Sequence, residues 1–308
     1  MLAPEAEGDE GLPARIRSHE GGARDGLQNE KSVVPTEVKA EFIRRLATSG
    51  LQTIETTSFV NPQWVPQLAD AADLLAMLGD EGRGPDRPVL VPNERGLDRA
   101  LEAGVGAVAI FGSATETFAR KNLNRTVAES IEMFRPVVTR SLDAGLTVRA
   151  YVSMCFGDPW EGPVPIGQVA DVCVALMDLG AHELSLGDTI GVGTPGHVRA
   201  LLAELDRRGV ARAATAVHFH DTYGQALANT LTALREGVTI VDSSAGGLGG
   251  CPYAESATGN LATEDLVWAL EGAGVETGVD LESLVATSTW MAAQLGRPSP
   301  SRVVTALT

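Results

Sequence analysis

Two histidines separated by one residue, His218 and His220, point most directly to chemistry in this sequence. The segment around them is apolar enough to form a β-strand, in which side chains two positions apart share one face. Two imidazoles on one rigid face suit a divalent cation, and Asp25 in the distant Arg24-Asp25-Gly26 segment could add an oxygen ligand. The sequence therefore favours metal-assisted chemistry, with Asp221 as a carboxylate that could orient an imidazole.

Four further residues could serve such a site, and each also has a simpler explanation. Cys251 lies in a glycine-rich loop that could carry a thiol inward as a proton donor or base, or could be a plain connector. Asn260 could offer an amide oxygen to the cation, although asparagine in a turn is the simpler interpretation. Glu55 and Asp188 are expected to pair with Arg24 or support the site rather than to react directly.

Two other features remain outside this hypothesis. Residues 191–196 match the glycine spacing of a dinucleotide site, but they follow the sixth expected strand and contain a proline. We therefore interpret them as a connection into a helix. His19 lies on a weak first strand, and the sequence gives it no role.

The elements that must position these residues repeat a short apolar strand and an amphipathic helix, most helices ending at a glycine. Eight such units predict a TIM (β/α)8 barrel with additional C-terminal helices at 262–272 and 281–295; an open doubly wound sheet is the alternative. Active sites in barrels lie at the C-terminal ends of the strands, where the residues above would meet. Strands are expected at 53–56, 89–91, 105–111, 147–152, 183–186, 215–219 and 238–241, and a weaker one at 14–18.

Composition limits the remaining possibilities. Residues 1–12 are expected to be a disordered acidic tail and 13–308 a single domain. The net charge of −16 disfavours nucleic acid as a partner, and no apolar run is long enough to span a membrane. Three cysteines without zinc-finger spacing suit a reducing compartment, so we expect a cytoplasmic protein.

Several stretches resemble, in order, the 3-hydroxy-3-methylglutaryl-CoA lyase family of metal-dependent TIM-barrel lyases and synthases, which share an Arg-Asp pair and a His-x-His. The likeness runs from about Glu20 into the C-terminal region. One departure is Gly21-Gly22-Ala23, where the family has an apolar residue and then Gly-Pro; Met154 and Asp158 also differ. The most specific stretches are residues 24–31, 54–60, 185–191, 217–224 and 247–253.

The resemblance implies cleavage of 3-hydroxy-3-methylglutaryl-CoA to acetyl-CoA and acetoacetate, as in leucine breakdown. Arg24 would stabilise the enolate, Cys251 would act as acid and base with help from His218, and Glu55 and Asp188 would support the site. Mg²⁺ or Mn²⁺ would be bound by Asp25, His218, His220 and Asn260. The acyl-CoA substrate would contact Arg24, Gln28, Lys31, Ser58, Arg120, Lys121, Asn122 and Thr189.

Three alternatives stay open at this point. One is a lyase of the same fold that acts on a longer 3-hydroxyglutaryl-CoA analogue. The second is a Claisen condensing synthase or 2-oxoacid aldolase, although such synthases commonly carry a long C-terminal extension and this chain ends at Thr308. The third is a barrel that has lost activity and serves as a binding scaffold. We also expect a homo-oligomer, with a dimer as the first choice.

Overall fold

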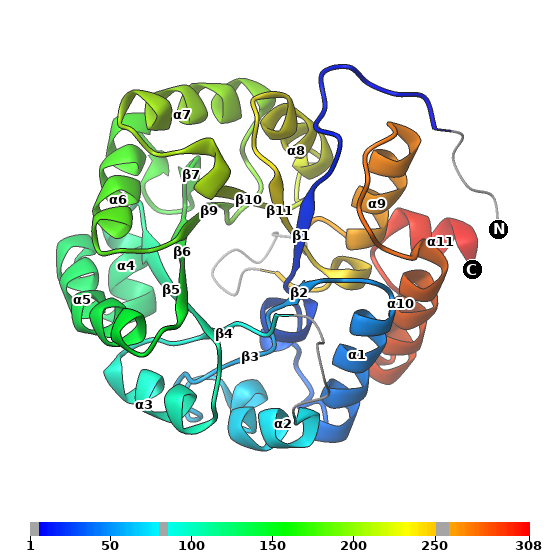
Figure 1. The fold of residues 1–308 in the computed structure, drawn as a ribbon, viewed down its shortest axis with the longest axis horizontal. Coiled ribbons are helices and arrows are strands. Elements are labelled where there is room, and N and C mark those ends of the chain that lie inside the picture. Colours follow the sequence, from blue (N-terminus) through cyan, green and yellow to red (C-terminus); the bar gives the residue numbers. More distant parts are fainter. Residues whose placement is uncertain (1–5, 80–85, 251–258) are drawn as a thin grey trace.

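The computed structural model describes residues 6–79, 86–250 and 259–308. Its central element is a curled sheet of parallel strands in the order β2-β1-β11-β10-β9-β6-β5-β4-β3, surrounded by helices (Figure 1). The strands of this sheet are β1 (Arg17–Glu20), β2 (Thr53–Ile54), β3 (Thr57–Ser58), β4 (Val89–Leu90), β5 (Ala107–Ser113), β6 (Thr147–Ser153), β9 (Glu183–Asp188), β10 (Thr215–Phe219) and β11 (Ile240–Ser243).

The sheet closes into a barrel through the short segment that holds β2 and β3. These two strands stand at opposite ends of the strand order, yet only Glu55 and Thr56 separate them in the chain. The Glu55 N–H donates to the Glu20 carbonyl on one side at 2.8 Å, and the Thr56 N–H donates to the Pro88 carbonyl on the other at 3.0 Å. Together β2 and β3 are one interrupted strand, so the predicted TIM barrel is confirmed.

The helices lie outside the barrel, and the apolar faces of several of them pack on the strands. Asparagine and threonine side chains start two of them: Asn93 caps α3, and Thr126 forms a capping box with Glu129 at α5. The α-helices are α1 (Thr36–Thr48), α2 (Ala71–Leu78), α3 (Glu94–Glu102), α4 (Glu116–Leu123), α5 (Val127–Asp143), α6 (Ile166–Asp178), α7 (Pro195–Arg207), α8 (Ala226–Arg235), α9 (Thr263–Gly272), α10 (Leu281–Leu295) and α11 (Arg302–Leu307).

The first and last barrel strands are displaced from the positions expected from apolar pattern. β1 ends at Glu20 rather than at residue 18, because Ser18, His19 and Glu20 are buried polar residues with partners inside the barrel. β11 ends at Ser243 rather than at residue 241, and Ser243 accepts a hydrogen bond from Thr263 at 2.9 Å. Satisfied polar side chains thus extend both strands beyond their apolar stretches.

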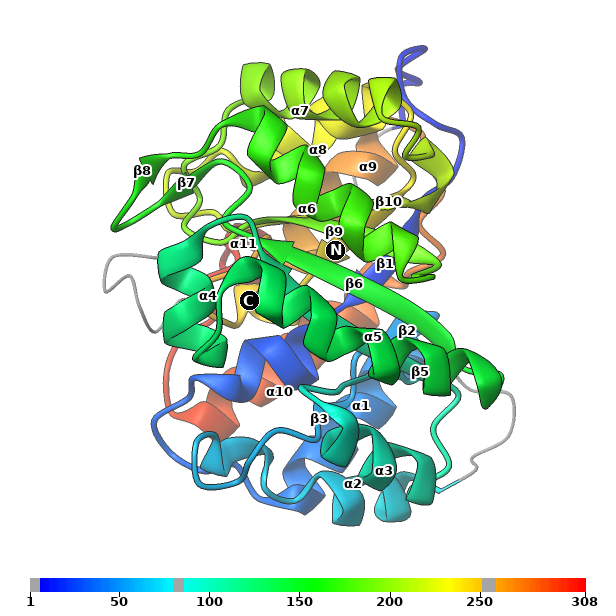
Figure 2. The same cartoon turned by 90° about the vertical axis from the view of Figure 1, so that its left-hand side faces the viewer.

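A small hairpin that the sequence did not indicate, β7 (Gly157–Asp158) and β8 (Gly162–Pro163), follows β6. It lies beside α4 at one end of the molecule (Figure 2). The Thr115 hydroxyl donates to Asp158 at 2.6 Å, and the Thr117 N–H donates to Glu161 at 2.6 Å. The hairpin therefore fixes the start of α4, the helix that carries Arg120 and Lys121.

The described part of the predicted acidic tail lies against α9. The Glu7 N–H donates to the Gly272 carbonyl at 3.0 Å, and the Asp9 N–H donates to the Ala273 carbonyl at 3.3 Å. The division into residues 1–12 and 13–308 stays a prediction. Among the described helices, none has the length and apolar character needed to cross a membrane.

Candidate metal centre and active site

The structure brings together the three residues that the sequence nominated first. Asp25 lies in the π-helix η1 (Gly22–Gly26), which follows β1, whereas His218 is on β10 and His220 lies one residue beyond that strand. One ligand atom from each of these side chains lies within 4.8 Å of the others. Two imidazole nitrogens and a carboxylate oxygen at such spacing form a set that a divalent cation can bind.

Asn260 completes this cluster from the other side. A backbone bridge joins it to His220, and its Nδ2 donates to Asp25 Oδ2 at 2.8 Å and to the Leu248 carbonyl at 3.1 Å. Its Oδ1 is buried and accepts no hydrogen bond within the described part of the chain. A buried amide oxygen without a partner is costly, and a cation would satisfy it after rotation of the amide. The donor set therefore fits a metal ion.

Arg24 lies beside this cluster and is held by two carboxylates. Its Nε donates to Glu55 Oε2 at 2.8 Å, and its Nη1 donates to Asp25 Oδ1 at 2.8 Å. Glu55 is placed there by the break between β2 and β3, and its side chain is fully buried. The predicted pairing of Glu55 with Arg24 is present, and it aims a guanidinium at the metal cluster.

The surroundings of the metal cluster lower the pKa of Asp25 and raise that of His218. Burial raises the pKa of Asp25, but Arg24 and the two imidazoles outweigh that effect and lower the pKa to about 2. Burial lowers the pKa of His218, but its contact with Asp242 and the charge of Asp25 outweigh burial and raise the pKa. Asp25 is therefore a carboxylate at neutral pH, as metal binding requires.

Asp242, on β11, is the main residue that sequence analysis missed. Its Oδ2 lies 3.3 Å from His218 Nδ1, and its other oxygen pairs with Arg149. Asp221, the carboxylate suggested from sequence, instead accepts from the Ala226 N–H at 3.0 Å. A carboxylate on Nδ1 keeps the proton there and leaves Nε2 for a metal. Asp242 could have been suspected only from its place at the end of a strand.

A cavity of about 330 Å³ opens in front of these residues at the C-terminal ends of the strands. Gln28, Asn122 and Thr189, three of the predicted substrate contacts, line it together with the apolar side chains of Phe111 and Phe118. A polar floor and apolar walls are typical of a site for a small organic ligand.

Arg24 also lines this cavity, whereas the remaining four predicted substrate contacts do not. Ser58 is buried, and its hydroxyl donates to the Leu90 carbonyl at 3.1 Å. Lys31 and Arg120 are exposed, and the Lys121 ammonium lies 4.8 Å from the centre of the Trp160 ring. Their roles toward substrate stay predictions.

Comparison with known proteins agrees with this geometry. The family model described as HMGL-like matches residues 15–291. The chain belongs to the HMGL-like family. The resemblance inferred from the sequence is thereby confirmed.

Individual relatives of this HMGL-like chain cover nearly all of it. It is 52% identical over 297 residues to the mitochondrial hydroxymethylglutaryl-CoA lyase of Arabidopsis thaliana, covering 96% of this chain but only 63% of the relative. A crystal structure of the HMG-CoA lyase of Bacillus subtilis superposes with a TM-score of 0.93 at 46% identity, covering 96% and 99% of the two chains. An Acinetobacter baumannii HMG-CoA lyase in complex with coenzyme A and 3-methylmalate superposes with a TM-score of 0.90 at 33% identity, covering 95% of each chain.

In this HMGL-like barrel Asp188 is not among the residues that line the cavity. Its carboxylate accepts from the N–H groups of Val192 at 3.0 Å and Gly193 at 2.8 Å, and burial raises its pKa to about 6. It therefore fixes the loop that leads into α7, the segment whose glycine spacing we interpreted as a connection. That interpretation is consistent with α7 beginning at Pro195.

Cys251 lies outside the described residues, so its proposed role stays a prediction. The described stretch before it is held firmly. Glu20 accepts from the Ala245 N–H at 2.8 Å, and Glu264 accepts from the Gly246 N–H at 2.9 Å. Burial raises the pKa of Glu20 to about 7 and that of Glu264 to about 8.

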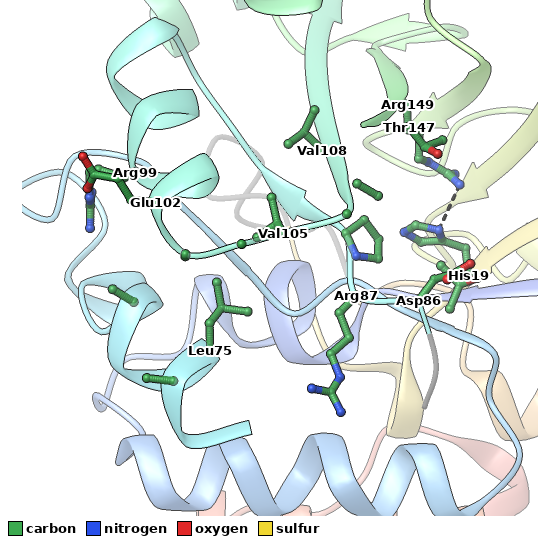
Figure 3. A pocket seen from close by; sticks show the side chains of 18 of the residues that line it. His19, Leu75, Asp86, Arg87, Arg99, Glu102, Val105, Val108, Thr147 and Arg149 are labelled. Atoms are coloured by element: carbon green, nitrogen blue, oxygen red, sulfur yellow. Dashed lines mark hydrogen bonds between the residues drawn. The ribbon is translucent and has the colours of Figure 1, made fainter. Parts of the chain in front are cut away.

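A larger cavity of about 870 Å³ opens at the opposite end of the barrel, where the strands begin. Arg87, Asp86 and Val105 lie along it, and His19 and Arg149 form its inner wall (Figure 3). Asp25, His218 and His220 do not contribute to its described lining. The metal cluster therefore lies at the smaller of the two cavities, and its donor atoms identify it rather than the cavity volume.

Proposed function

We propose that this chain is a divalent-metal-dependent lyase that cleaves 3-hydroxy-3-methylglutaryl-CoA to acetyl-CoA and acetoacetate. The observation that carries the proposal is the Asp25, His218 and His220 cluster, with Arg24 beside it at the wall of one cavity. The relatives named as hydroxymethylglutaryl-CoA lyases and the structure with coenzyme A support the choice of an acyl-CoA substrate.

Asp25, His218, His220 and Asn260 would hold the cation, either Mg²⁺ or Mn²⁺. Such a cation acts as a Lewis acid that lowers the pKa of a bound hydroxyl group. The four side chains come from three separate segments, each fixed by the barrel. The protein thus holds Asp25, His218 and His220 together before substrate arrives, and only the amide of Asn260 must rotate.

Arg24 stabilises the negative charge that develops on the thioester oxygen when the carbon–carbon bond breaks. Its guanidinium is already oriented by Glu55 and Asp25, so little reorganisation accompanies the reaction. Its side chain is 8% exposed. Water therefore screens its charge weakly, which strengthens its interaction with an anionic oxygen.

Two proton transfers remain. A base must remove the proton of the tertiary hydroxyl, and an acid must protonate the enolate carbon to give acetyl-CoA. We assign both transfers to Cys251, as base and then as acid, and a supporting part to His218, whose Nδ1 is held by Asp242. Glu55 and Asp188 support the site through Arg24 and through the loop before α7.

The cellular context is also part of this proposal. We expect a homo-oligomer, with a dimer as the first choice. A cytoplasmic location stays a prediction, because the Arabidopsis relative is named as a mitochondrial protein.

The direct test is formation of acetoacetate from 3-hydroxy-3-methylglutaryl-CoA by the purified protein with Mg²⁺ or Mn²⁺. Cys251→Ala and His220→Ala should each lose most of the activity. His197→Ala is the matched control, because His197 is exposed on α7 and should leave turnover unchanged. Wild-type protein that releases no acetoacetate with either cation would refute the proposal.

The same assay addresses the alternative lyase. A panel that includes longer 3-hydroxyglutaryl-CoA analogues ranks the substrates by kcat/KM. A longer analogue that is preferred would keep the reaction but change the substrate. Condensation of acetyl-CoA with a 2-oxoacid, measured by product analysis, should be absent.

A further inference from the structure

His19 is buried inside the barrel on β1, between the metal cluster and the cavity at the other end. Its side chain is 2% exposed and lies edge-on to Tyr151, with ring centres 6.4 Å apart. Both ring nitrogens have partners: Arg149 Nη1 lies 3.0 Å from Nδ1, and the Tyr151 hydroxyl lies 3.2 Å from Nε2. Figure 3 shows the contact with Arg149. A buried imidazole with two specific partners at an active site calls for a function.

The chemistry of Arg149 fixes the tautomer of this imidazole. A guanidinium carries only donors, so Nδ1 of His19 must be the acceptor and must lack a proton. A neutral imidazole then carries its proton on Nε2, which donates to the Tyr151 oxygen. Burial and the charge of Arg149 hold the pKa of His19 well below its usual range, so the neutral form persists near pH 7.

The tautomer of His19 determines what the Tyr151 hydroxyl can do. Because its oxygen already accepts from His19, its own proton is available to Glu55 Oε2, which lies 3.2 Å away. The same oxygen of Glu55 accepts from Arg24 Nε at 2.8 Å. If His19 accepted at Nε2 instead, Tyr151 would spend its only proton there, and Glu55 would lose a donor.

We propose that His19 is a positioning residue, which holds the Tyr151 hydroxyl as a donor to Glu55 and thereby fixes Arg24 for catalysis. This rests on the function proposed above. The hydrogen bonds run in one direction, from Arg149 through His19 and Tyr151 to Glu55. The strand that carries His19 is unusually polar, and this chain of hydrogen bonds accounts for the buried histidine there.

The first test examines the tautomer without any enzyme assay. The chain has five histidines, so nitrogen NMR of protein labelled at histidine resolves them, and the His19 signals are those absent from His19→Gln. We expect a neutral ring with the proton on Nε2 throughout pH 6 to 8. A protonated ring, or a proton on Nδ1, would overturn the proposal whether or not the protein cleaves the thioester.

The second test uses two substitutions that each keep one half of the histidine. In His19→Asn the amide oxygen can replace Nδ1 toward Arg149, but no donor reaches Tyr151. In His19→Gln the amide nitrogen can replace Nε2 and donate to Tyr151. We expect kcat to fall about tenfold in His19→Asn and to stay within about threefold in His19→Gln, with equal Mn²⁺ affinity in both.

The outcomes separate this proposal from the proposed function. Equal kcat for His19→Asn and His19→Gln, or a loss that follows Mn²⁺ affinity, would show that His19 only packs or acts through the metal. Similar thermal unfolding of the two variants is the control for folding. Inactive wild-type protein would refute the lyase assignment, and the NMR result would still decide whether His19 holds Tyr151 as a donor.

Discussion

Replacing Asp242 with asparagine should weaken metal binding without removing a metal ligand. Asp242 Oδ2 lies 3.3 Å from His218 Nδ1 and accepts from the Ser185 hydroxyl at 2.8 Å, while Oδ1 accepts from Arg149. Asparagine has one oxygen, and Arg149 offers only donors, so that oxygen must face Arg149. The amide nitrogen then faces His218 Nδ1 as a second donor.

Two donors that face each other cannot form a hydrogen bond, so the tautomer of His218 must change. Its Nδ1 must become an acceptor, so its proton moves to Nε2, the atom that faces Asp25 Oδ2 at 3.9 Å. A protonated Nε2 has no lone pair for a cation. Changing a residue that orients a metal-bound histidine typically costs about 10- to 100-fold in metal affinity, and we expect that range for Asp242→Asn.

Calorimetric titration with Mn²⁺ measures this effect directly. Ser185→Ala is the matched control, because it removes another donor to the same carboxylate oxygen and leaves the bond to His218. It should change affinity by less than about threefold. Arg149 keeps its pairing with Glu183, so Asp242→Asn should still fold, which thermal unfolding would verify. Wild-type affinity in Asp242→Asn, or equal weakening in Ser185→Ala, would refute the reasoning.

Three further predictions concern Arg24, Glu20 and Gly26. Arg24→Lys should lower kcat by about 100-fold or more and leave Mn²⁺ affinity nearly unchanged. Lysine lacks the planar guanidinium that can donate to Glu55 and to a substrate oxygen at the same time. An unchanged kcat would contradict this. Burial raises the pKa of Glu20 from 4.5 to about 7, so its contribution to stability is present below pH 4.5 and is lost as pH rises toward 7. The unfolding free energy of Glu20→Gln relative to wild type should therefore rise by roughly 3 kcal/mol across that window in denaturant titrations, and a difference independent of pH would argue against it. Gly26→Ala should destabilise the fold by about 1–3 kcal/mol, because its Cβ would lie 2.9 Å from Leu248 Cβ; an unchanged midpoint of thermal unfolding would contradict that packing argument.

Local sequence was enough for most of the barrel. Alternating apolar strands and amphipathic helices predicted the βα repeat, and the His-x-His spacing placed two imidazoles near each other because the period of a strand is two. The location of the site at the C-terminal ends of the strands followed from the fold, since parallel strands of a barrel end on one side. The sequence therefore predicted that Asp25 lies close to the two histidines.

The local sequence did not predict where the strands end or what the buried polar residues do. Apolar pattern ended β1 too early, because Glu20 is satisfied by the N–H groups of Gly22 and Ala245, and the latter is far away in the chain. Asp188 was expected to pair with Arg24 or to support the site, and its carboxylate accepts from the loop before α7. The direction of a side chain at a strand end depends on which donors the neighbouring segments present.

The amino-acid sequence by itself determined the barrel and the residue types at its metal cluster, because periodicity and spacing are properties of nearby residues. Only the tertiary structure decided which carboxylate holds His218 and what His19 does. Asp242 and His218 meet across neighbouring strands, and His19 contacts Arg149 and Tyr151 from across the barrel interior. Hydrogen bonds between segments that are distant in the chain depend on strand register and barrel closure, which no local pattern records.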